Sequence, residues 1–79
     1  MPTVLRVGAY QFSFYSNERR EPPHVHVGAG DNEAKLWLAD CSVARSKGFA
    51  DHELRKISQL VYENRDVILE RWVKHFGRT

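Results

Sequence analysis

The sequence of 79 residues has a single cysteine, Cys41, and therefore neither an intrachain disulfide nor a cysteine cluster that could hold zinc. No apolar run approaches the length that spans a membrane, and the first residues, Met-Pro-Thr-Val-Leu-Arg-Val, lack the apolar segment of a signal peptide. A glycine-rich phosphate loop, a helical His-Glu-x-x-His pattern and a Ser-His-Asp order are absent as well. These absences favour a reducing, cytoplasmic environment and exclude the common nucleotide-loop and zinc-peptidase classes.

The composition suits one small folded domain over residues 1–79. Hydrophobic residues make up 42% of the chain and aromatic residues 11%, which is enough for one compact core and argues against disorder. A chain of this size has a thin margin of stability, so a partner or a homodimer would help it. The net charge of +2 is compatible with nucleic acid but does not indicate it.

The first part of the chain has the pattern of a β-hairpin. Residues 3–7 and 10–16 flank Gly8-Ala9, a two-residue turn with glycine in its first central position, as a type II′ turn requires. This turn places Val7 opposite Tyr10. One face of the hairpin is then apolar, with Leu5, Val7, Tyr10, Phe12 and Phe14.

The most informative stretch is Glu-Pro-Pro-His-Val-His-Val at residues 21–27, here called the histidine block. Two prolines favour an extended backbone, and the alternation that follows is typical of a half-buried strand. Residues 28–32 form a turn cluster and residues 33–38 a returning strand, which pairs His26 with Lys35 and His24 with Trp37. The predicted mixed face carries Arg6, Gln11, Ser13, Tyr15, His24, His26, Lys35 and Trp37.

The second half of the chain is predicted to be helical. Residues 40–48 read as a connection, with a short turn of helix around Ser42–Arg45, and a helix follows from near Asp51 to Gly77. The apolar pattern is interrupted at residues 64–66 without glycine or proline, which we interpret as one long or kinked helix rather than two. The predicted class is α+β, with a four-stranded, mostly antiparallel sheet of two hairpins packed on one face by this helix.

Side chains two apart on a strand share a face, so His24 and His26 are neighbours and are the candidate catalytic residues. The alternatives are surface decoration and metal binding. Two imidazoles are too few for a tight zinc site, so we expect no metal and no cofactor. The candidate substrate- or partner-binding residues around the pair are Arg6, Tyr15, Lys35 and Trp37.

Several segments together resemble a small bacterial family, domain-of-unknown-function family 4160. They are Phe-Ser-Phe-Tyr-Ser at 12–16, the histidine block, Ala-Lys-Leu-Trp-Leu at 34–38, and the tail with Trp72 and Phe76-Gly77. The resemblance implies a protein partner encoded by a neighbouring gene, in an arrangement like a toxin–antitoxin pair. It implies no established activity.

Two functions follow as hypotheses. In the first, the chain is the toxin-like half of such a pair and acts on RNA, with His24 and His26 as acid and base, Arg6 or Lys35 on the phosphate, and an aromatic ring on a base. In the second, the same face docks a protein and has no catalytic role.

Overall fold

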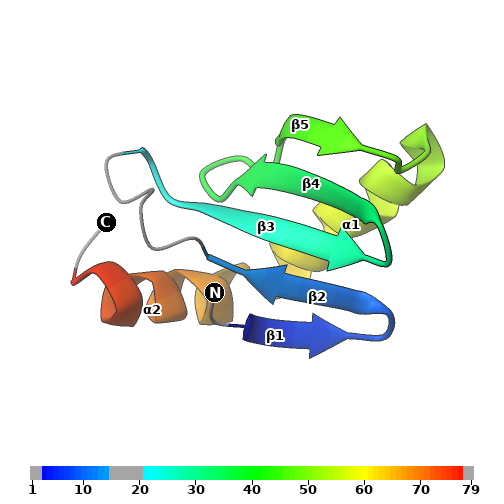
Figure 1. Ribbon diagram of the computed structural model, residues 1–79. Coiled ribbons are helices and arrows are strands. Elements are labelled where there is room, and N and C mark those ends of the chain that lie inside the picture. The colour runs from blue at the N-terminus through cyan, green and yellow to red at the C-terminus, as the bar shows by residue number, and fades with distance from the viewer. Residues whose placement is uncertain (1–2, 15–20, 78–79) are drawn as a thin grey trace.

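The computed structural model, which describes residues 3–14 and 21–77, has a five-stranded antiparallel sheet with two helices behind it (Figure 1). The sheet order follows the chain order, so each strand pairs only with its neighbours in sequence. The elements are β1 (Thr3–Val7), β2 (Tyr10–Ser13), β3 (His24–Ala29), β4 (Asn32–Trp37), β5 (Val43–Lys47), α1 (Asp51–Glu63) and α2 (Arg65–Phe76). The α+β class and the antiparallel sheet are therefore confirmed.

Both predicted hairpins have the expected register. Val7 lies opposite Tyr10 in the first hairpin, and His24 lies opposite Trp37 in the second. Gly8 has a φ of 57°, the positive value that the first central residue of a type II′ turn requires. The two hairpins are joined through β2 and β3, where Phe12 pairs with Val27.

The prediction of four strands is wrong, because residues Val43–Lys47 form a fifth strand against β4 and not a turn of helix. All five of its residues are exposed, and Val43 is its only large apolar side chain. The hydrogen-bonded ladder with β4 therefore defines this strand, since it buries no apolar face of its own. The backbone N–H of Trp37 donates to the carbonyl of Ser42, 2.9 Å away, where β5 begins.

The prediction of one long or kinked helix is also wrong, since Asn64 separates two helices. Its side-chain amide donates to the carbonyl of Leu60 at 2.8 Å, in competition with the backbone. Its own carbonyl accepts the N–H of Ile68 at 3.0 Å and so begins α2. Gly77 ends α2 in the left-handed conformation, as the sequence predicted.

The core lies between the sheet and the helices. Its fully buried members are Phe12, Phe14, Val25, Val27, Leu36, Leu38, Ile57, Val61, Ile68 and Trp72. Val25, Val27 and Leu36 belong to it, so the second hairpin has its apolar face toward the core, opposite the predicted mixed face. Neither α1 nor α2, the helices of the described ranges, has the length and apolar character that crossing a membrane requires.

The turn between β4 and β5 is fixed by polar contacts. The hydroxyl and the backbone N–H of Ser42 both donate to the carboxylate of Asp40, at 2.7 and 3.0 Å, which lowers the pKa of that carboxyl. Cys41 follows in a left-handed conformation with a φ of 60°, and its carbonyl accepts the hydroxyl of Ser58 at 2.7 Å. Burial raises the pKa of the Cys41 thiol and so favours its neutral form over the thiolate.

Candidate functional site on the sheet face opposite the helices

The sheet face opposite the helices, here called the polar face, carries two rows of polar side chains that cross the strands. Cross-strand partners point to the same side of a sheet, so the pairings define the rows. One row is Arg6, Gln11, Gly28, Glu33 and Lys47, and the next is Ser13, His26, Lys35 and Arg45. His24 and Trp37 follow as a third pair, at the end where β3 begins.

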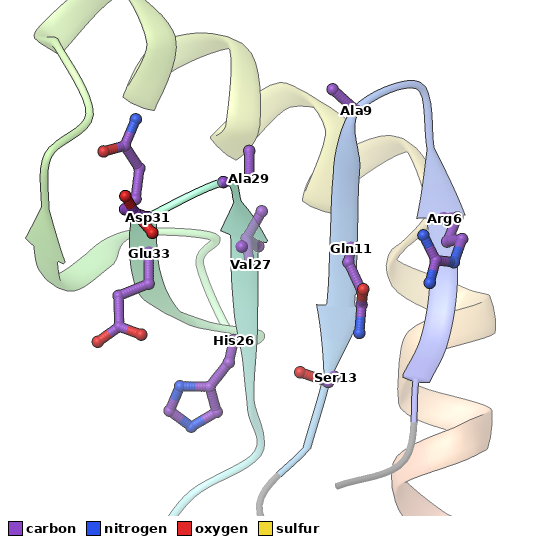
Figure 2. Close-up of a pocket in the computed structure, with 12 residues that line it drawn as sticks. Arg6, Ala9, Gln11, Ser13, His26, Val27, Ala29, Asp31 and Glu33 are labelled. Atoms are coloured by element: carbon purple, nitrogen blue, oxygen red, sulfur yellow. The ribbon is translucent and has the colours of Figure 1, made fainter.

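A cavity of about 400 Å³ lies on the polar face, and its floor is Gly28 in β3. Figure 2 shows its walls: Arg6 on β1 and Gln11 and Ser13 on β2 stand on one side, and His26 and Glu33 on the other. A Cβ atom built on Gly28 would meet only the carbonyl oxygen of Asn32, at 3.9 Å. The absence of a side chain at Gly28 therefore contributes to the hollow, which we call the Gly28 pocket.

A second cavity, of about 190 Å³, lies between β4 and β5 on the same face. It shares His26 and Glu33 with the Gly28 pocket, and its other polar lining includes Lys35, Arg45 and Lys47. The two cavities are thus the two sides of a ridge formed by His26 and Glu33. His26 is only 7% exposed, yet it borders both hollows, which is where a ligand on this face would lie.

His24 lies deeper than the sequence suggested, because none of its surface is exposed. Its Nδ1 donates to the carbonyl of Pro22 at 2.9 Å, so the proton of the neutral ring is on Nδ1. Trp72 of α2 packs edge-on against the ring with 5.2 Å between ring centroids, and Trp37 does so at 5.7 Å. The place of His24 on the predicted mixed face therefore does not expose its ring, which fills the space at the end of the sheet.

Lys35 is buried on the polar face, where Glu21 and Trp37 are among its partners. Its ammonium donates to the carboxylate of Glu21 and lies 4.9 Å from the centroid of the Trp37 ring. The same Glu21 carboxylate is 3.7 Å from Nδ1 of His24. Glu21, the first residue of the histidine block, thus connects the block to β4 through its ion pair with Lys35. This ion pair neutralises most of the Lys35 charge.

Three other cations on the polar face are available to an anionic ligand. No ion pair or hydrogen bond is found within residues 3–14 and 21–77 for the side chains of Arg6, Arg45 and Lys47, and all three residues are exposed. Arg6 is on β1 and Lys47 on β5, so the cations lie at the two sides of the sheet. Strands are spaced about 4.8 Å apart, which places these sides about 19 Å from one another.

The predicted site residues are only partly brought together. His24, His26, Lys35 and Trp37 are adjacent as expected, while Arg6 lies across the Gly28 pocket from them, and Tyr15 lies outside the described residues. Sequence reasoning missed Arg45 and Lys47 as site residues because their segment was not recognised as a strand. The available signal was their spacing of two, which places two cations on one face of a strand.

Among the residues that the structure describes, no group of three or more His, Cys, Asp or Glu side chains could hold a metal ion. The polar face offers a ligand exposed cations and hydrogen-bonding side chains.

The fold and the site define a small α+β domain whose antiparallel sheet is covered on one face and polar on the other. The chain belongs to the family described as Domain of unknown function (DUF4160), whose model matches residues 9–73. The match runs from the first hairpin turn almost to the end of α2 and so includes the walls of both cavities except Arg6. Comparisons with curated proteins and with solved structures found no match.

Proposed function

We propose that this chain is the RNA-binding, toxin-like half of a two-protein module in the bacterial cytoplasm, and that RNA lies across the polar face. The observation that carries the proposal is the pair of cationic sides, Arg6 on one and Arg45 with Lys47 on the other, with two cavities between them. The phosphates of a single RNA strand can bind the cations at the two sides, and its unstacked bases can enter the two cavities between them.

Binding is better supported than cleavage by the two histidines. An acid and a base must both reach the substrate, and His24 has no exposed surface with which to do so. In this proposal His26 contacts the RNA, and His24 is a positioning residue whose ring packs against that of His26 at 5.3 Å between centroids.

The first test measures the affinity of a short fluorescent single-stranded RNA by anisotropy over a range of salt concentrations. Arg45→Ala is expected to weaken binding and to lower the slope of log K against log salt by about 0.7, the value for one phosphate contact on a single strand. Arg55→Ala is the matched control, because Arg55 is an equally exposed arginine on α1, behind the sheet. Equal effects of the two variants would contradict the proposal.

A protein-docking function is the second candidate, and the exposure of β5 favours it. This strand lies at an edge of the sheet, and all five of its residues are exposed, so its outer side can pair with a strand of another chain. The partner would be the neighbouring gene product or a second copy of this chain. Light scattering of the protein alone and with that product separates the two, and displacement of bound RNA by the product would show that both use one surface.

A further inference from the structure

The Gly28 pocket is a gap one side chain wide in the middle of a polar row. Gln11 and Glu33 are the cross-strand neighbours of Gly28 on either side. Two strand spacings put the Cα atoms of Gln11 and Glu33 about 10 Å apart. A flat ring can stand on the glycine between these two side chains, and a hollow of about 400 Å³ is within the size range of small-ligand sites.

The walls of the pocket suit a base better than a phosphate. The ionised carboxylate of Glu33 only accepts hydrogen bonds and repels an anion, whereas the Gln11 amide and the Ser13 hydroxyl both donate and accept. Phosphates have better sites at the edges of this face. One is Arg6, on the wall of the pocket farthest from Glu33, and the other is the second cavity, where Arg45 and Lys47 lie. A chain that crosses the face therefore places its charges at the sides and one base in the middle.

Guanine is the base whose edge matches a carboxylate. Its N1–H and N2–H2 groups are adjacent donors, so the two oxygens of one carboxylate can accept both. Adenine and cytosine offer one amino group beside an acceptor nitrogen, and uracil offers one N–H between two carbonyls. An acceptor-only wall such as Glu33 distinguishes guanine from all three.

We propose that the Gly28 pocket binds one guanine base of single-stranded RNA, with the Glu33 carboxylate accepting its N1–H and N2–H2. This rests on the proposed RNA binding and adds its base preference. Asp31 is the other carboxylate at the pocket, but it lies in the turn between β3 and β4 and not in the row with Gly28. The proposal therefore assigns the contact to Glu33 alone.

The test compares oligouridine RNAs of one length that carry a single central guanine, adenine or cytosine, with the all-uridine RNA as the reference. The guanine RNA is expected to bind about tenfold more tightly, near the low end of the range for one bidentate base contact. Glu33→Gln should abolish this preference while tightening the binding of the other RNAs, because a negative charge is removed from the face. Asp31→Asn and Glu70→Gln, the latter on an exposed position of α2, should both preserve the preference.

Gly28→Val provides an independent variant that puts a branched side chain where the base would lie against Gly28. Gly28 does not have a positive φ, and a Cβ there meets no atom closer than 3.9 Å, so the substitution is compatible with the strand. The variant should bind all four RNAs equally and retain the salt dependence of the wild type. A melting curve like that of the wild type is the control for folding.

The outcomes separate this inference from the proposed function. If no RNA binds with a salt-dependent affinity, RNA binding itself is wrong. If RNA binds but the four oligonucleotides are equivalent, or if Gly28→Val or Glu33→Gln keeps the guanine preference, only the guanine assignment is overturned. A preference lost in Asp31→Asn and kept in Glu33→Gln would move the contact to Asp31 and refute the proposal as stated.

Discussion

The ring of His24 has the surroundings of a core residue although its strand position faces away from the helices. Aromatic rings of Trp37 and Trp72 contact it from β4 and α2, and the Pro22 carbonyl accepts its Nδ1–H. Its burial orders the start of β3 and thereby the place of His26 on the polar face.

Replacement of His24 by alanine is therefore expected to destabilise the fold. Loss of the buried ring leaves a cavity, and the Pro22 carbonyl loses its donor, so the free energy of unfolding should fall by about 2–4 kcal/mol. Urea unfolding at neutral pH measures the change. His52→Ala is the control, because His52 is exposed on α1 and should change stability by less than about 0.5 kcal/mol. A His24→Ala protein as stable as the wild type would show that the ring contributes no packing energy.

At this scale the alternation of the histidine block was sufficient to predict which residues share a face. The side-chain period of a strand allows only two faces, and the position of the turn at residues 28–32 then placed His26 opposite Lys35 correctly. The pattern could not predict the burial of His24, which depends on Trp72 of α2, 48 positions later in the chain. The contact between His24 and Trp72 is made at the end of the sheet by residues far apart in the chain, so the sequence around His24 does not indicate it.

Among the elements, β5 matters most for the site, since it supplies Arg45 and Lys47. Its hydrogen-bonded ladder with β4 defines it, and it has no buried side chain. Periodicity could not predict this strand, because an edge strand with both faces in solvent has no apolar alternation. The separation of α1 from α2 was equally hard to predict, since it depends on one side-chain hydrogen bond from Asn64.

The hydroxyl of Ser58 connects α1 to the turn that leads into β5, through the carbonyl of Cys41. Ser58→Ala removes this hydrogen bond, and local opening of β5 should become easier by about 1 kcal/mol. We expect the β5 amides that pair with β4 to exchange with solvent about fivefold faster, as measured by native-state hydrogen exchange. Gln59→Ala is the control, because within residues 3–14 and 21–77 the Gln59 side chain donates only to the exposed Glu63 on the same helix. Unchanged exchange in β5 would mean that Ser58 does not hold the turn.

At the scale of the whole molecule, Trp72 connects the helix layer to the sheet layer. It is 1% exposed and contacts Phe14 on the sheet side, Phe76 on its own helix and His24 at the start of β3. The α+β class was predicted from the strand pattern in the first half of the chain and the helical pattern in the second. The overall charge of +2 gave no indication of the polar face, because a sum over the chain does not show where the charges gather.

Trp72→Ala is expected to remove about 3–5 kcal/mol of stability, most of what a domain of this size has. The protein should then be largely unfolded at 37 °C, with a loss of the near-ultraviolet circular dichroism signal. Tyr62→Ala is the comparison, since Tyr62 is 67% exposed on α1 and its removal should leave the melting temperature within a few degrees. A cooperative transition of Trp72→Ala at the wild-type temperature would contradict this account of the core.

The match between sheet order and chain order has a consequence for synthesis and for truncated forms of the chain. Arg6 is on the first strand and Lys47 on the last, so the cationic surface is complete only after the final strand has added to the sheet. A fragment that stops before residue 43 contains the sequence of the histidine block and of both hairpins, yet it lacks Arg45, Lys47 and the two helices that complete the core. The histidine block is therefore not enough to form the cationic surface, which needs β5 and the helices that follow it.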